Sequence, residues 1–291
     1  MTNPVRAAAI PIIDTHQHLW DLDKFKLAWL TPDSPLNRCC LPADYAKEAE
    51  GLNIVKTIYM EVDVIEAQQA AEARWILDLC DLDKATPCAA VISGRPDSDK
   101  FAAYLDEFRD RKALKGVRQV LHVASTPPGT CLNPKFVAGM HRLGERGLSF
   151  DLCIKPGELA NVAKLLDQCK GTQFILDHCG NPSLQDKDLG PWKADLARVA
   201  ERKNVVCKVS GVIATAKKGE WKADDLAPIV NAVLDTFGPD RVMFGGDWPV
   251  CTLGASLHDW VEALRKVVSG RSEADRRKLF HDNAARVYRL G

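Results

Sequence analysis

Residues 149–177, SFDLCIKPGELANVAKLLDQCKGTQFILD, contain the smallest unit that indicates the fold of this chain. Residues 149–154 and 173–177 are short and largely apolar, as expected for strands that are buried on both faces. Between them, residues 158–170 have helical periodicity, with one apolar face formed by Leu159, Val162, Ala163, Leu165 and Leu166. A strand, a helix and a strand in this order indicate two parallel strands joined by a helical crossover.

The same alternation extends over the rest of the chain. Strands are expected at 9–14, 55–62, 88–93, 116–122, 149–154, 173–177, 205–209 and 242–246. Helices are expected at 67–82, 100–111, 134–146, 158–170, 193–202, 225–237, 257–268 and 276–288. Eight strand–helix units predict an α/β fold, a (β/α)8 TIM barrel, and we expect residues 1–291 to form it as a single domain. Residues 20–42 form a long loop without clear periodicity after the first strand, and long loops in compact domains are often functional.

The length and charge balance of the chain indicate what kind of molecule it binds. The chain has 291 residues, the usual size of one such barrel, and its 39 Lys and Arg balance 39 Asp and Glu. A net charge of zero creates no field that would attract nucleic acid or an acidic membrane surface. We therefore expect a small-molecule substrate as the partner, and the composition leaves open whether the protein is a homo-oligomer.

The positions of the cysteines and the lengths of the apolar runs indicate the cellular compartment in which the protein is expected. The 10 cysteines are scattered, include no C-x-x-C pair and lie mostly in apolar runs, which favours free thiols in a reducing environment. Arg6 and Pro11 interrupt the apolar stretch at the start of the sequence, so no signal peptide is expected there. No run approaches the roughly 18 apolar residues of a membrane span. These features predict a cytoplasmic protein.

Two histidines, His16 and His18, follow the first predicted strand in the segment Asp14-Thr15-His16-Gln17-His18. Side chains two residues apart on a strand point the same way, so both imidazoles can face the C-terminal end of the barrel. Barrel active sites lie at that end. Two imidazoles that converge there could hold one metal ion, whereas the alternative is two unrelated histidines in a turn.

Two further polar residues occur at strand ends. His178 follows Phe174-Ile175-Leu176-Asp177 and precedes a turn, and Asp247 follows the last predicted strand within the segment 243–249, MFGGDWP. An aspartate after a strand usually caps the next helix, but Trp248-Pro249 intervenes here. Four such residues at three strand ends fit one site better than four coincidences.

Several motifs resemble a known group of enzymes. The segments HQH (16–18), LDHCGNP (176–182), GGDWP (245–249) and HDNAARVYRL (281–290) resemble the amidohydrolase superfamily, and more narrowly its second amidohydrolase family. The segments IDTHQHLWDLDKFKLAWL (13–30) and KGVRQVLH (115–122) look most like the group of sugar-lactone lactonases (fuconolactonase, rhamnonolactonase) and sulfomuconolactonase. The resemblance covers nearly the whole chain and implies a hydrolase, a lactonase that opens a carboxylic ester bond.

The resemblance also implies roles for individual residues. His16 and His18 match the metal ligands of the first strand, His178 matches the histidine of the sixth strand, and Asp247 matches the aspartate that handles the proton of the attacking water. The fifth strand has no histidine, and Lys115 precedes the fourth strand, so no bridging lysine is expected. We therefore expect one divalent ion, zinc, on His16, His18, His178 and Asp247 rather than two, and catalysis without a metal stays open.

The expected reaction is attack of activated water on the ester bond of a small lactone, with a sugar (aldono) lactone favoured. Asp247 would act as general base, His178 would orient or polarise the carbonyl, and Arg118 would stabilise the oxyanion or bind a substrate carboxylate. A structural ion pair is an equally good interpretation of Arg118. Substrate contacts are expected from Trp20, Glu61 and Trp248. Lys208, in the seventh predicted strand, is a further candidate, and its side chain could instead face the helices.

Two other functions compete with this one. A metal-dependent, non-oxidative decarboxylase of a small carboxylate uses a similar set of ligands, and it would release carbon dioxide rather than acid. A binding protein without catalytic activity is possible on the same fold, because a barrel alone does not define a function. The presence of four potential catalytic residues together argues against the binding protein.

Overall fold

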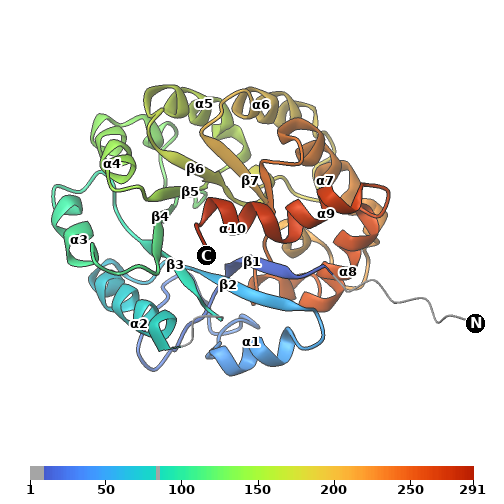
Figure 1. Cartoon of the computed structure of the whole chain (residues 1–291), viewed down its shortest axis with the longest axis horizontal. Helices are drawn as coiled ribbons and strands as arrows, with labels where there is room; N and C mark the ends of the chain where they lie inside the picture. The colour runs from blue at the N-terminus through green and yellow to red at the C-terminus, as the bar shows by residue number, and fades with distance from the viewer. Residues whose placement is uncertain (1–9, 83–85) are drawn as a thin grey trace, which may run out of the picture.

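Eight parallel strands form the centre of the molecule, and the computed structural model describes residues 10–82 and 86–291. Each strand is hydrogen-bonded to its neighbour in sequence, in the order β1 to β8. The strands are β1 (Ile12–Gln17), β2 (Ile54–Met60), β3 (Ala89–Ser93), β4 (Leu114–Val120), β5 (Ser149–Cys153), β6 (Gln173–Leu176), β7 (Val205–Val209) and β8 (Val242–Phe244). Helices surround this ring (Figure 1), which confirms the predicted (β/α)8 barrel.

The helices agree with most of the expected segments. They are α1 (Pro42–Glu48), α2 (Gln69–Leu82), α3 (Phe101–Glu107), α4 (Pro134–Glu145), α5 (Leu159–Gln168), α6 (Gly190–Ala200), α7 (Ala223–Phe237), α8 (Leu257–Val267), α9 (Glu273–Arg277) and α10 (Asn283–Val287). The short helix α1 was not expected as a separate element. The last expected helix, 276–288, is divided into α9, a π-helical turn over Lys278–Asp282, and α10.

The ring is closed between the end of β1 and the segment that follows β8. The Asp247 amide donates to the His16 carbonyl over 2.7 Å, and the His18 amide donates to the Trp248 carbonyl over 2.8 Å. The first strand was expected at 9–14 but runs over Ile12–Gln17; residue 9 lies outside the described part of the chain. His16 therefore belongs to the strand itself, where the barrel walls hold its backbone.

Two buried apolar clusters stabilise the barrel. The larger lies between the strands and the surrounding helices. The smaller fills the interior and contains one or two residues from several strands, including Ile13, Met60 and Ile175, together with Ala284 and Tyr288 from the C-terminal segment. Figure 1 shows α10 across the centre of the ring of strands. This segment therefore covers the end of the barrel opposite the carboxyl ends of the strands, and the open end is left for a site.

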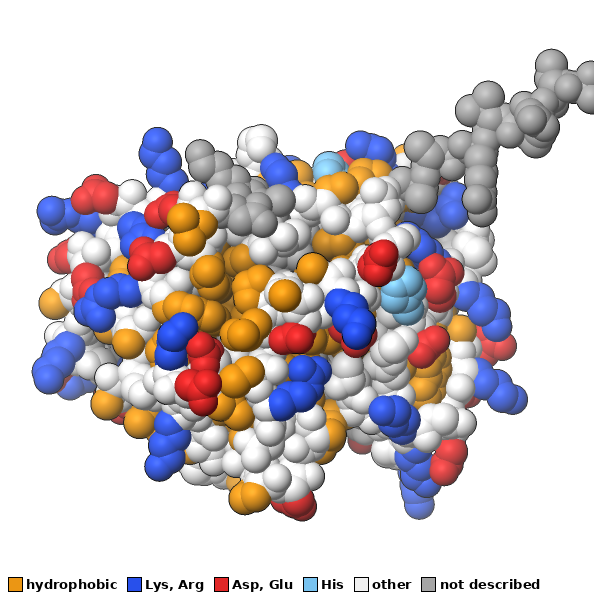
Figure 2. Space-filling view, turned by 90° about the horizontal axis from the view of Figure 1, so that it is seen from below, with side chains coloured by type: hydrophobic (Ala, Val, Ile, Leu, Met, Phe, Trp, Pro, Cys, Tyr) orange, Lys and Arg blue, Asp and Glu red, His pale blue; other side chains and the backbone are white. Residues whose placement is uncertain are grey.

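On the face in Figure 2, Lys and Arg side chains alternate with Asp and Glu side chains. Within residues 10–82 and 86–291, no helix is long and apolar enough to cross a membrane. All ten cysteines are free thiols, as their spacing predicted.

Candidate active site

A cavity of about 300 Å³ opens at the carboxyl ends of the strands. Its walls combine large apolar side chains with a small number of polar groups, which is the usual composition of a site for a small molecule. The lining residues include Trp20, Trp29, Val62, Val120, Val123 and Val250 on the apolar side, and His18, Asp63, Arg118, His122, His178 and Asp247 on the polar side.

Three of the expected residues meet at the base of this cavity. The Asp247 carboxylate oxygen Oδ1 lies 3.4 Å from His18 Nε2 and 3.7 Å from His16 Nε2. The two imidazole rings are edge-to-face, with their centroids 4.9 Å apart. His16 is completely buried, whereas His18 and Asp247 both contact the cavity. The structure therefore brings His16, His18 and Asp247 together from the two ends of the sequence.

The backbone around Asp247 is shaped by its neighbours. Asp247 has a φ of 57°, in the left-handed region that costs a non-glycine residue on the order of 1–3 kcal/mol. Its amide is held by the His16 carbonyl, and the preceding Gly246 amide donates to the buried Asp14 carboxylate over 2.7 Å. A Cβ on Gly246 would lie 2.4 Å from Asp14 Oδ2, so only glycine fits there. These contacts hold the carboxylate in an orientation that the chain would not adopt alone.

The donor set suits a divalent metal ion. One ligand atom from each of His16, His18 and Asp247 lies within 4.8 Å of the others. His18 Nδ1 lies 2.9 Å from the Met60 carbonyl, so this nitrogen carries the proton and the lone pair of Nε2 faces Asp247. A backbone carbonyl that orients a histidine in this way is typical of metal ligands. Two imidazoles and one carboxylate fit a zinc ion with a position left for water or substrate.

The surroundings of the site favour an ionised Asp247 and neutral His16 and His178. Burial alone would raise the pKa of Asp247, but His178, His18 and His16 outweigh it and lower the pKa to about 2. Burial lowers the pKa of His178, and it lowers that of His16 well below the ordinary value against the opposing effect of Asp177. A neutral imidazole can bind a metal or donate one hydrogen bond, and an ionised carboxylate can accept a proton.

The His178 ring packs against the His16 ring, with the two ring centroids 4.4 Å apart. Its φ of 52° is also left-handed, and its Nδ1 lies 2.9 Å from the Ser210 hydroxyl. A Cβ on Gly211 would lie 2.5 Å from His178 Cγ and Nδ1, so the ring packs directly on this glycine. The turn after β6 and the turn after β7 thus fix the imidazole that lines the cavity.

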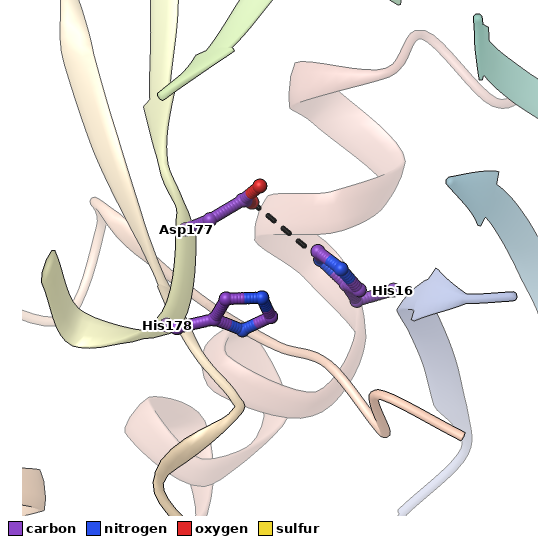
Figure 3. Close-up of side chains that lie close together, drawn as sticks. All are labelled: His16, Asp177 and His178. Atoms are coloured by element: carbon purple, nitrogen blue, oxygen red, sulfur yellow. Dashed lines mark ion pairs between the residues drawn. The ribbon is translucent and has the colours of Figure 1, made fainter. Parts of the chain in front are cut away.

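Figure 3 shows a second group of potential ligands, His16, Asp177 and His178, which shares His16 with the first group. His16 Nδ1 is 3.5 Å from the Asp177 carboxylate, which is completely buried. Two protein cations already contact this carboxylate: Lys208 Nζ at 3.2 Å and Arg118 Nη1 at 3.6 Å. Although burial would raise the pKa of Asp177, Lys208 and His16 lower it well below the ordinary value. The charge that a second metal ion would supply here is supplied by side chains.

The sequence left two orientations open for the Lys208 side chain, toward the site or toward the helices, and the structure has the first. Its side chain lies fully buried inside the barrel, where Nζ is 2.6 Å from the Asp151 carboxylate and 3.4 Å from His16 Nδ1. Burial would lower the pKa of Lys208, but Asp151 and Asp177 outweigh it and raise the pKa. An isolated buried ammonium would be costly, and the two carboxylates offset that cost.

Sequence reasoning missed Asp151, although a signal was present. Asp151 is the charged residue of the strand segment SFDLC, and Lys208 that of VVCKV. A single charge in an otherwise apolar central strand needs a partner, and charges of opposite sign in two strands of one barrel can supply it. That argument could have paired the two residues.

Arg118 was expected either to bind the substrate or to form a structural ion pair, and its position is compatible with both roles. Its Nε donates to the Glu61 carboxylate over 2.7 Å and its Nη2 donates to the Glu61 carbonyl over 2.6 Å, which is a structural ion pair. Arg118 also lines the cavity, and its Nη1 lies 3.4 Å from His16 Nε2. It therefore links the cavity wall to the buried charges below.

The expected substrate-contact residues lie in different surroundings. Trp20 lines the cavity, and its indole nitrogen donates to the Arg38 carbonyl over 2.6 Å. Trp248 and Glu61 are completely buried and do not belong to the lining of this cavity as the described residues form it. Trp29, from the long loop after β1, packs edge-to-face on Trp20 and remains 40% exposed at the cavity mouth.

Comparison with known proteins agrees with this arrangement. The profile of the family described as amidohydrolase matches residues 13–290. The chain is 30% identical to an L-fucono-1,5-lactonase of Burkholderia multivorans, over 96% of each chain. It is 25% identical to an L-rhamnono-gamma-lactonase of Scheffersomyces stipitis, over 61% of this chain and 59% of that protein. A crystal structure of an amidohydrolase from Burkholderia multivorans with bound zinc superposes with a TM-score of 0.87 at 27% identity, over 97% of this chain and 100% of that chain.

A barrel with polar residues at the carboxyl ends of its strands and a profile match over 13–290 define the class of protein. The chain belongs to the amidohydrolase family, and it is a hydrolase.

Proposed function

We propose that this enzyme hydrolyses the ester bond of a small lactone, a sugar (aldono) lactone. The observation that carries the proposal is the Asp247 carboxylate, ionised and 3.4 Å from His18 Nε2, at the base of a cavity of about 300 Å³. A cavity of this volume suits a molecule of one ring. The names of the related lactonases support the substrate class, since the chain covers 96% of one of them.

Asp247 and His178 have different roles in the proposed hydrolysis. Asp247 accepts a proton from water as the water oxygen bonds to the lactone carbonyl carbon. The bond between that carbon and the ring oxygen then breaks, and Asp247 returns the proton to the leaving alkoxide. The Ser210 hydroxyl can donate to His178 Nδ1, which leaves the Nε2 hydrogen of His178 to polarise the carbonyl oxygen.

His16, His18 and Asp247 would hold one divalent metal ion, zinc, in this proposal. When bound, the ion supplies Lewis acidity toward the attacking water and the carbonyl. The residues around the set are arranged for this role, because the Met60 carbonyl orients His18 and burial keeps His16 neutral.

The test is acid release measured with a pH indicator, using a panel of aldonolactones and muconolactones with and without a chelator. We expect hydrolysis of an aldonolactone and a loss of about 100-fold or more in Asp247→Asn. A surface variant, Asp240→Asn, serves as the control because Asp240 pairs with Lys278 far from the cavity.

Two other outcomes would contradict parts of the proposed function. Acid release that Asp247→Asn leaves unchanged would contradict the proposed base. No acid release from any lactone would overturn the lactonase proposal, and a carbon dioxide assay with small aromatic and unsaturated carboxylates would then test the decarboxylase alternative.

A further inference from the structure

A histidine and a cysteine that have no role in the proposed reaction form a pair on the cavity wall. His122 follows β4 and Cys153 ends β5, and both line the cavity. His122 Nδ1 lies 3.0 Å from Cys153 Sγ. Main-chain pairing holds the two residues together, because Val120 is opposite Cys153 in the ladder and the Leu121 amide donates to the Cys153 carbonyl over 2.8 Å.

The surroundings determine which atom of this pair carries the proton. Burial raises the pKa of the Cys153 thiol to about 12, so the sulfur keeps its hydrogen at neutral pH. Burial, followed by His178 and Arg118, lowers the pKa of His122 to about 4, so the imidazole is neutral. A thiol sulfur is only a weak acceptor, whereas an unprotonated imidazole nitrogen is a good one, so the favoured arrangement has the thiol donating to His122 Nδ1. A neutral imidazole whose Nδ1 accepts carries its hydrogen on Nε2.

The Nε2 hydrogen of His122 is available to a ligand. In the part of the chain that the structure describes, Nε2 makes no hydrogen bond. Other polar groups on the wall already have partners. The Asn181 amide donates to the Ile154 carbonyl over 2.7 Å, and the Thr215 hydroxyl donates to the Val212 carbonyl over 2.8 Å.

We propose that His122 binds the substrate by donating its Nε2 hydrogen to a hydroxyl oxygen of the lactone, and that Cys153 is the positioning residue that sets the tautomer of His122. The inference rests on the proposed lactonase function, which it deepens: the site selects a hydroxylated lactone over an unsubstituted one. A donor among apolar side chains and polar groups that already have partners gives this preference, because the hydrogen bond forms only when the substrate has an oxygen there.

The experiment compares two lactones in four variants. The wild-type enzyme, His122→Phe, His122→Gln, Cys153→Ser and Cys153→Ala are assayed with a hydroxylated aldonolactone and with δ-valerolactone, which has no hydroxyl group. We expect His122→Phe to lose about tenfold in kcat/KM for the aldonolactone, mainly through KM, and to change little with δ-valerolactone. His122→Gln, which keeps an N–H donor, should recover part of the loss.

The Cys153 variants test the positioning role. Cys153→Ser keeps a donor toward Nδ1 and should behave like the wild type, whereas Cys153→Ala should raise KM for the aldonolactone only. A matched control is His141→Phe, because His141 lies 3.9 Å from the Cys169 sulfur in a similar pair that does not line the cavity. Equal losses with both lactones, or no loss with either, would overturn the proposal.

A binding measurement separates this proposal from the lactonase proposal. The hydroxylated lactam and δ-valerolactam have the same shapes as the two lactones and resist hydrolysis, so calorimetric titration with them needs no turnover. Tighter binding of the hydroxylated lactam that His122→Phe removes would support the donor role even if no lactone is hydrolysed. Equal affinity of the wild type for both lactams, or binding of neither, would overturn it.

Discussion

The Lys208 ammonium lies 2.6 Å from the Asp151 carboxylate inside the barrel, and neither side chain is exposed to solvent. Lys208 also contacts Asp177 at 3.2 Å, and Asp177 lies 3.5 Å from His16. The Lys208 ammonium therefore supplies a positive charge beside the two buried carboxylates on the inner side of His16.

Replacing Lys208 by methionine should strongly destabilise the fold. The substitution leaves Asp151 buried without its partner, and losing one partner of a buried pair costs about 3–5 kcal/mol. The double variant Lys208→Met/Asp151→Leu should recover part of the loss, because neither charge of this pair then remains and Arg118 still contacts Asp177 at 3.6 Å. Urea unfolding checks this, with Lys266→Met as the control, since Lys266 pairs with Asp224 at the exposed surface. A double variant as unstable as the single one would contradict the pairing.

One metal ion per chain is the expected stoichiometry. His16, His18 and Asp247 form a set that contacts the cavity, whereas the neighbouring set around Asp177 already holds Lys208 and Arg118. Elemental analysis after dialysis against zinc should find one equivalent, and His18→Asn should lower it. Asp23→Asn, in a surface group of acidic residues, should leave it unchanged. Two tightly bound equivalents would show that the protein cations do not replace the second ion.

Gly211→Ala should impair activity more than it impairs folding. The new Cβ would lie 2.5 Å from the His178 ring, and the φ of 69° adds backbone strain on the order of 1–3 kcal/mol. Gly147→Ala is the matched control, because Gly147 has a φ of 65° with no other atom within 4 Å of the added Cβ. Both variants should lose stability in thermal unfolding, and only Gly211→Ala should lose about tenfold or more in kcat. Similar activities would show that His178 tolerates displacement.

Glu72 on α2 should make the stability depend on pH. Burial and then Glu61 raise the pKa of Glu72 from 4.5 to about 8, and its carboxyl accepts hydrogen bonds from the Tyr59 hydroxyl and the Val62 amide. Between these pH values the folded protein keeps a proton that the unfolded chain has released. The free energy of unfolding should therefore fall as pH rises from about 4.5 to 8, at up to about 1.4 kcal/mol per pH unit.

Glu72→Gln should flatten this dependence, because the amide keeps an acceptor and a donor without a charge. Glu107→Gln, which changes an exposed carboxylate paired with Arg74, should not flatten it. Urea unfolding at several pH values makes the comparison. The same slope in the wild type and in Glu72→Gln would show that another group is responsible.

The sequence by itself determined the class of fold and much of the site. Eight short apolar runs alternate with amphipathic segments, and this local pattern specifies parallel strands with helical crossovers whatever the details of packing. The ends of such strands meet at one end of a barrel, so His16, His18, His178 and Asp247 could be expected near one another. The boundaries were less accurate, because hydrogen bonds such as that of the Asp247 amide with the His16 carbonyl extend β1 beyond its apolar run.

Only the tertiary structure decided which charges face one another. Lys208 and Asp151 lie 57 positions apart, and their pairing depends on the twist and register of three neighbouring strands. Alternation along a strand leaves two possible faces, and the energy of burying a charge decides between them only when its partner is known. For the same reason the His122–Cys153 pair could not be predicted from the sequence. Its sulfur and nitrogen are in contact because β4 and β5 end side by side.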